Sequence, residues 1–244
     1  MEPLRHLVEP SRLLMTWQPA DERVFPRTRR IVGEVVPGGA IADDWVFRYF
    51  LDSSDLESAQ EAGFKGYPAF RLEDREFNKG VRETLLRRLP PRSREDFDDY
   101  LAMHRLPHPF PLSDLALLGY TGGRLPSDGF SFVPEFPLSE EPCEYILEVA
   151  GVRHNFSGDT SSIHLGDSVT LIPEPTNEVD DQAITVCWAG QKLGYVNRAL
   201  LPVFHHWIEH GLIQGRIERL NGKVDRPMIY VRVLVNCSEA AAVA

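Results

Sequence analysis

Histidine and aspartate side chains gather in the last third of the chain at spacings that could do chemistry. His206 and His210 stand four residues apart, so on one helix they would share a flank and could chelate a metal ion. Asp180 and Asp181 could join such an ion in a nuclease or another hydrolase. The alternatives are a solvated helix surface for the histidines and a polar turn for the aspartates. Because no third ligand lies close to the histidines in sequence, we favour the surface interpretation and predict no metal site.

Catalytic motifs of fixed spacing are missing from the sequence. The nearest approach to a phosphate-binding loop is 215–223, but six residues separate its glycines and Val224 follows the lysine. The phosphate cradle and the magnesium-binding hydroxyl are therefore both lacking. The Rossmann glycine triplet, the Gly-x-Ser-x-Gly elbow and the HExxH zinc motif are also absent. The sequence predicts a protein that is not an enzyme and has no cofactor.

The composition indicates a globular protein with an acidic balance. Hydrophobic residues make up 43% of the 244 residues and charged residues 25%, and the net charge is −10. This charge has the wrong sign for coating DNA non-specifically, so any nucleic-acid site must be local. One basic cluster is present, and we interpret it as a solvated helix and turn surface. It consists of Arg82, Arg87, Arg88, Arg92 and Arg94.

The cysteines and the hydropathy of the sequence indicate the cellular compartment in which the protein would function. Cys143, Cys187 and Cys237 are odd in number and far apart, which argues against a disulfide framework or a paired-cysteine zinc site. The first residues alternate leucine with charged residues, so we expect no signal peptide. No stretch approaches the roughly 18 apolar residues of a membrane span. We expect a soluble, cytoplasmic protein without a membrane partner.

Two domains are expected, because the length exceeds that of a typical single domain. A segment rich in proline and glutamate between Phe130 and Cys143 separates two differently patterned regions. We therefore predict an α+β domain over 1–140 and a second domain over 143–236. No repeat of 20 to 50 residues is visible.

The second region reads as strands around one helix. Short runs rich in Val, Ile, Leu and Tyr predict strands over 144–152, 168–174, 183–189, 213–220 and 228–235. The Asn-Gly pair in 220–223 predicts a hairpin turn. Apolar residues at helical spacing from Leu200 to Ile208 predict a helix that ends near Gly211. A small β-barrel with one helix is the simplest arrangement.

The first region mixes element types. Strands are predicted over 30–36 and 45–49, and helices over 78–89 and 93–104. Pro90 and Pro91 separate the helices, and Ser93 is the expected N-cap of the second. These elements give the region its α+β class.

The most distinctive pattern lies between Gly166 and Arg198. A strand is followed by Glu174-Pro175, Asn177, Asp180 and Ala183-Ile184, and then by Gly194-Tyr195-Val196-Asn197-Arg198 before a helix; Gly151-Val152-Arg153-His154 precedes it. This pattern resembles the HIRAN domain over 143–235. The resemblance implies an OB- or SH3-like barrel that binds single-stranded DNA at a free 3′ end.

The resemblance also implies the roles of individual residues. Asp180 would accept a hydrogen bond from the terminal 3′-hydroxyl, while Arg153 and Arg198 would contact phosphates. His154 stands where the family has the aromatic residue that stacks on the terminal base, and Val179 replaces the aromatic before the aspartate. The predicted DNA-binding set is Arg153, His154, Asn177, Asp180, Tyr195 and Arg198.

The first region resembles the N-terminal subdomain of HipA-type kinases. The resemblance rests on residues 47–49, 77–90, 96–100, 115–123 and 128–129. In that family the ATP-binding part follows this subdomain in a much longer chain, so kinase activity is not implied.

Two main hypotheses follow. The first is a non-enzymatic protein whose barrel captures a single-stranded DNA 3′ end and whose N-terminal domain binds a helicase-like or kinase-like protein. The second is a regulatory interaction module of a HipA-like toxin–antitoxin or kinase system, in which the barrel only supports the first domain.

Overall fold

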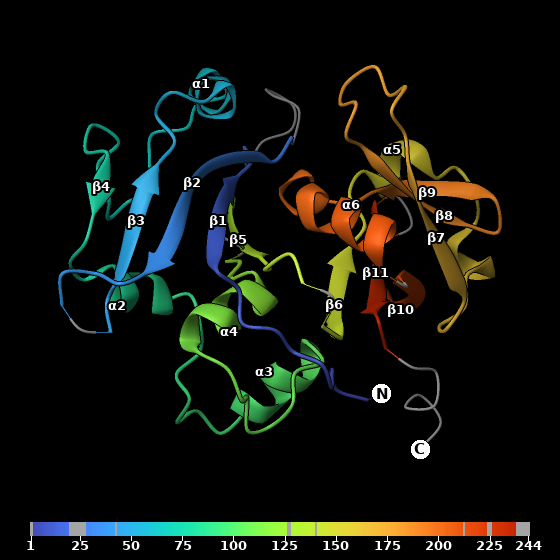
Figure 1. The fold of residues 1–244 in the computed structure, drawn as a ribbon, viewed down its shortest axis with the longest axis horizontal. Helices are drawn as coiled ribbons and strands as arrows, with labels where there is room; N and C mark the ends of the chain where they lie inside the picture. Colours follow the sequence, from blue (N-terminus) through green and yellow to red (C-terminus); the bar gives the residue numbers. More distant parts are fainter. Residues whose placement is uncertain are drawn as a thin grey trace. The chain divides into compact units, whose positions relative to one another are not determined.

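The chain divides into two compact units in the computed structural model, which describes residues 2–19, 28–41, 43–125, 128–139, 141–211, 213–223 and 226–237. One unit is Glu9–Phe136, and the other combines Met1–Val8 with Pro137–Ala244. The first residues thus belong with the C-terminal sheet, whereas the predicted boundary placed them in the N-terminal domain. Glu144 N donates to the His6 carbonyl at 2.7 Å and Arg232 Nη2 to the Glu2 carbonyl at 2.5 Å. Figure 1 follows the chain by colour through both units.

The unit Glu9–Phe136 contains a five-stranded antiparallel sheet in the order β4-β3-β2-β1-β5. Its strands are β1 (Arg12–Trp17), β2 (Arg30–Pro37), β3 (Trp45–Tyr49), β4 (Glu76–Phe77) and β5 (Phe130–Glu135). Its helices are α1 (Ser54–Glu61), α2 (Val81–Leu86), α3 (Phe97–Met103) and α4 (Asp114–Thr121). The predicted strands at 30–36 and 45–49 correspond to β2 and β3, while β1, β5 and α1 had not been predicted.

The helices α2 and α3 are shorter than predicted; a tertiary contact sets the start of α2, and local turns precede α3. Gly80 precedes α2 with φ +67°, and the Asp44 carboxylate accepts hydrogen bonds from Gly80 N at 2.6 Å and Arg82 N at 2.9 Å. The expected N-cap at Ser93 is wrong, because α3 begins at Phe97 after Asp96. Residues 91–97 instead form successive turns, in which Arg94 N donates to the Pro91 carbonyl and Phe97 N to the Arg94 carbonyl.

The arginine cluster is paired with carboxylates, and its prediction as a solvated surface is wrong for Arg88. The Arg88 side chain is 3% exposed and makes a two-pronged contact with Asp128 at 2.9 and 2.8 Å. Its Nε donates to the Gly123 carbonyl at 2.6 Å. A buried guanidinium needs these partners because an unpaired buried charge is costly. The other four arginines pair with Asp114, Glu83 and Asp96.

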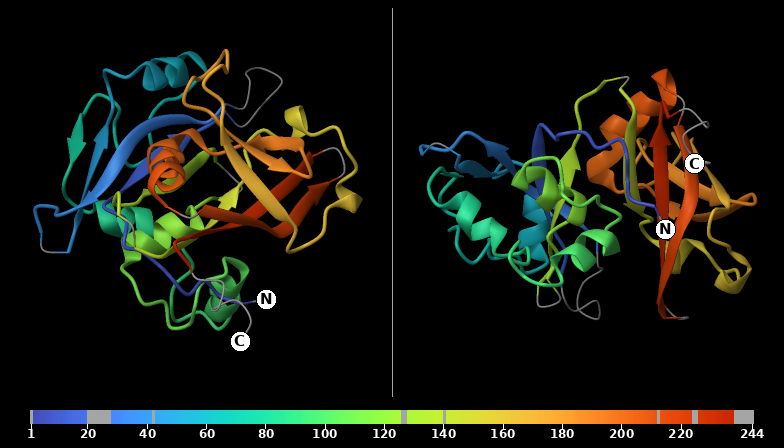
Figure 2. Two further views of the ribbon diagram at one scale, coloured as in Figure 1. Left: turned by 45° about the vertical axis from the view of Figure 1, so that its right-hand side comes forward. Right: turned by 90° about the horizontal axis from the view of Figure 1, so that it is seen from below.

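The second unit is a curled antiparallel sheet of six strands in the order β6-β11-β10-β7-β8-β9. Its elements are β6 (Cys143–Glu148), α5 (Val152–Asn155), η1 (Thr160–Ser162), β7 (Ser168–Pro173), β8 (Ile184–Trp188), β9 (Gln191–Tyr195), η2 (Arg198–Leu200), α6 (Leu201–His210), β10 (Ile213–Lys223) and β11 (Arg226–Val235). Figure 2 shows the strands curling around one interior. The curled sheet is consistent with the predicted OB-like fold, and the α/β mixture agrees with the predicted class.

The two ends of this sheet meet at one bridge. Ala150, just beyond β6, exchanges hydrogen bonds with Tyr195 of β9 at 2.8 and 2.9 Å. Gly194 makes this approach possible, because a Cβ atom at that position would lie 2.2 Å from the Ala150 carbonyl oxygen. Gly151 then turns the chain with φ +71° into α5. The predicted strand over 144–152 therefore ends early, at Glu148.

Two further expectations for this unit are corrected. The strand β9 had not been predicted. The hairpin turn at 220–223 is wrong, because Asn221 pairs with Met228 and Gly222 with Pro227 inside the β10–β11 ladder. The additional ladder pairs outweigh the local turn preference of Asn-Gly. The connection itself, residues 224–225, lies outside the described residues. The predicted helix and its end at Gly211 are confirmed by α6.

No helix in the described ranges is long and apolar enough to cross a membrane.

Substituting Gly194 tests whether the bridge holds the curled sheet. We expect Gly194→Ala to lower the free energy of unfolding by about 3 kcal/mol, because the methyl group forces the Ala150 carbonyl away. Gly190→Ala is the comparison, since Gly190 has φ +76° but open space around it, and backbone strain alone costs about 1 kcal/mol. Urea unfolding of both variants checks this. Equal losses would show that the close approach at Gly194 contributes nothing.

Candidate nucleic-acid interface

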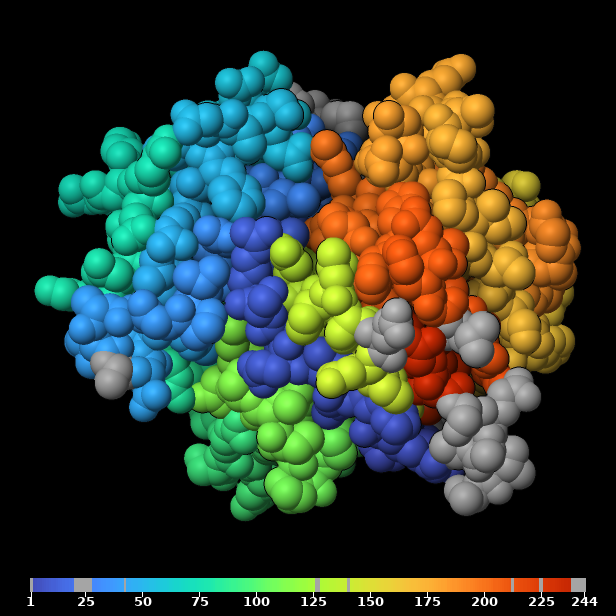
Figure 3. Space-filling view, in the orientation of Figure 1, coloured from blue at the N-terminus to red at the C-terminus, as the bar shows by residue number. Residues whose placement is uncertain are grey.

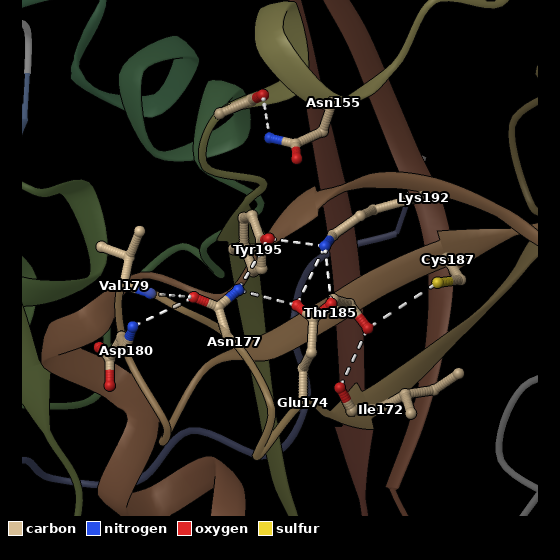
Figure 4. A network of polar contacts seen from close by, with 11 residues as sticks. Asn155, Ile172, Glu174, Asn177, Val179, Asp180, Thr185, Cys187, Lys192 and Tyr195 are labelled. Carbon is tan, nitrogen blue, oxygen red and sulfur yellow. Dashed lines mark hydrogen bonds and ion pairs between the residues drawn. The ribbon is translucent and has the colours of Figure 1, made fainter.

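Asn177 organises the loop between β7 and β8. Its Oδ1 accepts hydrogen bonds from Val179 N at 3.0 Å and Asp180 N at 3.1 Å. Its Nδ2 donates to Glu174 Oε2 at 2.9 Å and to the Tyr195 hydroxyl at 3.0 Å. Figure 4 shows these contacts converging on the amide. The amide thus fixes the backbone that carries Asp180 and ties this loop to the end of β9.

An ion pair between Glu174, which follows β7, and Lys192 of β9 supports Asn177. Lys192 Nζ lies 3.0 Å from Glu174 Oε2 and 2.6 Å from the Tyr195 hydroxyl, and 4.2 Å from the centre of the Tyr195 ring. Hydrogen bonds from Asn177 and Lys192 hold the pKa of Glu174 below its ordinary value. Burial alone would lower the pKa of Lys192, but its bonds to Tyr195 and Glu174 raise it overall. Both groups are therefore charged near neutral pH.

Asp180 and Arg198 face each other at the surface. Asp180 Oδ1 accepts a hydrogen bond from Gln182 N at 3.0 Å, as a polar turn residue would. Asp180 Oδ2 lies 3.6 Å from Arg198 Nε, and the side chains are 27% and 59% exposed. One oxygen of the Asp180 carboxylate thus accepts a hydrogen bond within the loop, and the other lies beside the accessible Arg198 guanidinium.

Arg198 is placed by the turn that leads from β9 into α6. Asn197 precedes it, and the Asn197 side chain accepts a hydrogen bond from Ala199 N at 3.1 Å. Ala199 and Leu200, the next two residues of this turn, are buried. Because these neighbours anchor the backbone, the Arg198 side chain projects outward.

Arg153 and His154 lie on α5, and both are exposed. This short helix starts at Val152, two residues after Ala150, so the bridge to Tyr195 brings its backbone beside the end of β9. Asn155 Nδ2 closes the helix onto the Gly151 carbonyl at 2.8 Å. The loop that carries Asp180 projects at the surface of this unit, where Val179 is 95% exposed; the segment is coloured gold in Figure 3.

The structure therefore joins Asn177, Asp180, Tyr195 and Arg198 in one connected group and links α5 to it through the backbone. Sequence reasoning missed the part played by Glu174 and Lys192. The sequence pattern gave little indication of a role for Lys192. Because β9 had not been predicted, no strand placed this lysine opposite Glu174.

The histidines of α6 have other partners. The rings of His206 and His210 stack with centres 4.7 Å apart, and His210 Nδ1 lies 3.2 Å from the His206 carbonyl. His205 Nε2 lies 2.8 Å from the Gln182 carbonyl. Within the ranges that the structure describes, a group of side chains that could hold a metal ion lies elsewhere in the fold. It contains neither these histidines nor Asp180 and Asp181.

Comparison with known proteins finds one family model that matches part of this unit. Residues 144–236 match the HIRAN domain family. This match supports a DNA-binding role in general. None of the curated proteins compared with the chain matches it. The comparisons give no support to the resemblance of the N-terminal half to HipA.

Two solved structures are also similar. The HIRAN domain of human HLTF is 20% identical, with a TM-score of 0.30, and the similarity covers 38% of this chain and 74% of that one. A protein from Lactobacillus plantarum is 20% identical, also with a TM-score of 0.30, and covers 39% of this chain and 99% of its own.

The Glu174–Lys192 pair predicts a pH dependence of stability. The pKa of Glu174 is lowered in the folded state. The stability that its ionised carboxylate contributes is therefore fully present above the ordinary pKa of 4.5, and it is lost as the pH falls through the folded pKa. We expect Glu174→Gln to flatten the fall of Tm on the acid side. Glu178→Gln, on the same loop, is the matched control. Thermal unfolding across pH 3 to 7 checks this, roughly the range in which carboxylates titrate, and parallel curves for wild type and Glu174→Gln would contradict it.

Proposed function

We propose that the HIRAN-like unit binds single-stranded DNA at a free 3′ end, and that Asp180 and Arg198 together read that end. The observation that carries the proposal is their 3.6 Å separation at the surface. A terminal nucleotide offers a hydroxyl donor beside a phosphate, so it matches an acceptor beside a cation. Asp180 Oδ2 would accept the hydroxyl proton, and Arg198 would contact the adjoining phosphate.

The negative charge of Asp180 explains how a protein with a net negative charge would prefer a DNA strand that ends in a 3′-hydroxyl. A 3′-phosphate or an internal phosphate at the same place would bring its negative charge against the Asp180 carboxylate, whereas a hydroxyl brings a proton that the carboxylate can accept. Discrimination then rests on repulsion of the wrong group as much as on attraction of the right one. Arg153, on α5, would supply a further phosphate contact.

Tyr195 and Asn177 would support the site rather than stack on a base. One face of the Tyr195 ring lies against Lys192, and the Asn177 amide is occupied by the loop and by Tyr195. His154 is the exposed ring available for stacking. Because base stacking contributes about 1 to 3 kcal/mol per base, we expect modest affinity with a strong dependence on salt.

Asp180→Asn is the sharpest test. The wild-type protein should prefer a 3′-hydroxyl to a 3′-phosphate by about tenfold, or about 1.4 kcal/mol, which lies at the lower end for a hydrogen bond to a charged group. The variant keeps the shape but loses the charge, so the preference should disappear while binding to the hydroxyl end persists. Fluorescence anisotropy with labelled oligonucleotides of both end types measures it.

Asp181→Asn is the matched control, because Asp181 is the exposed neighbour and bonds Gln182 Nε2 at 3.2 Å. It should keep the preference. A wild-type protein that binds both end types equally would contradict the proposal.

Arg198→Ala should weaken binding to every end type. Because this variant cannot neutralise the phosphate that Arg198 would bind, the slope of log K against log salt should fall by about 0.7, the value for one phosphate on a single strand. Titrations at several salt concentrations check it, with Lys223→Ala as a control for the removal of one exposed charge. A selective effect on hydroxyl ends alone would contradict this role.

We further propose that the unit Glu9–Phe136 binds a helicase-like or kinase-like protein and that the chain is a non-enzymatic cytoplasmic adaptor. The pairing of its arginine cluster with carboxylates supports a protein partner over a nucleic acid. Affinity capture with and without nuclease treatment tests this. A partner that disappears with nuclease would contradict direct binding.

A further inference from the structure

Three metal-ligating side chains of different chemistry meet at one end of the β6–β11 pair. The donor atoms of His6, Glu144 and Cys237 all lie within 4.8 Å of one another. They come from three chain segments: the N-terminal segment, the start of β6 and the residues after β11. Glu144 N donates to the His6 carbonyl at 2.7 Å, which holds the first two together. Cys237 Sγ lies 3.3 Å from the Val235 carbonyl, beside the same strand end.

One oxygen of the buried Glu144 carboxylate lacks a hydrogen bond among the described residues. Glu144 is 3% exposed, and among the described residues its Oε2 has no hydrogen-bond partner. Arg232 Nη1 lies 4.0 Å from that oxygen, beyond hydrogen-bond distance. The same guanidinium lies 3.5 Å from Glu218 and donates to the Glu2 carbonyl. Since buried polar atoms are nearly always bonded, this oxygen calls for a further partner.

We propose that His6, Glu144 and Cys237 bind a zinc ion. An imidazole nitrogen, a carboxylate oxygen and a thiolate are the three donor types that zinc takes in proteins, and the thiolate disfavours magnesium and calcium. Tetrahedral bonds of about 2.0 to 2.3 Å place ligand atoms roughly 3.5 Å apart, so donor atoms at the 4.8 Å limit would move together by about 1 Å on binding the ion. Water would complete the fourth position.

Charge balance favours the dication. The carboxylate and the thiolate together carry the two negative charges that neutralise Zn²⁺, while His6 binds as a neutral ring. Burial and the nearby Glu144 charge raise the pKa of Cys237, so without metal the thiol keeps its proton. As the zinc–sulfur bond forms, that proton leaves to solvent, and zinc affinity therefore falls as the pH is lowered.

The site would act as a clamp on the C-terminal unit. It joins the N-terminal segment and the end of β11 to the start of β6, an edge strand of the curled sheet. A ligand that binds only the folded state raises stability. This role is independent of DNA binding.

The test uses the full chain freed of metal with a chelator and titrated with Co²⁺ and Zn²⁺. We expect one ion per chain, thiolate-to-cobalt charge-transfer absorption in the near ultraviolet, and a rise in Tm with Zn²⁺. Cys237→Ser should abolish the charge-transfer band. His6→Ala and Glu144→Gln should each weaken Zn²⁺ binding by more than the roughly 10- to 100-fold that loss of an outer-shell partner costs.

Cys187→Ser is the matched control, because Cys187 is a free, half-buried cysteine outside the cluster, and it should leave the band and the affinity unchanged. The proposal is overturned by the absence of stoichiometric binding, or by a band that survives Cys237→Ser. It is also overturned if binding is lost in His206→Ala but kept in His6→Ala, which would assign the ion to α6. The His6 variant alters only the N-terminal segment, so it tests the site even if Glu144→Gln fails to fold.

Discussion

Two backbone hydrogen bonds between Ala150 and Tyr195 join the two ends of the C-terminal sheet, and the candidate site is built on that bridge. Tyr195 is placed by it, and the Tyr195 hydroxyl accepts from both Asn177 and Lys192. Asn177 in turn holds the backbone of Asp180. Gly194 is the residue that permits the approach, since any side chain there would meet the Ala150 carbonyl. A backbone constraint is thus transmitted through one tyrosine to the half-buried Asp180 carboxylate.

Local electrostatics, rather than net charge, decides what this surface can bind. The chain carries −10 overall, and many of its cations are committed to internal partners. Lys192 is paired with Glu174, and Arg88 is buried against Asp128. Arg198 is different, because it is mostly exposed and its partner Asp180 is held by the loop. An acceptor and a cation side by side can distinguish ligands that a uniformly basic surface would bind alike.

The N-terminal residues form part of the second unit. Residues 2–8 belong with the C-terminal sheet in the division of the chain, and through His6 and Glu2 they contact both β6 and β11. The HIRAN match begins at residue 144 and does not include them. The family resemblance therefore describes the curled sheet, while this chain adds a segment from its other end.

The sequence by itself determined the position of the HIRAN-like region, most of its strands, the helix α6 and the loop motif from Glu174 to Arg198. These features depend on local patterns: alternation in strands, helical spacing, and glycine or proline at turns. Only the tertiary structure decided that Asn221-Gly222 stays in a ladder, that Arg88 is buried, and that Lys192 supports Asn177. It also decided that His6 and Cys237 meet at Glu144. The reason is that these outcomes rest on contacts between segments far apart in the chain, where ladder pairing, burial and charge compensation outweigh the local preferences that a sequence displays.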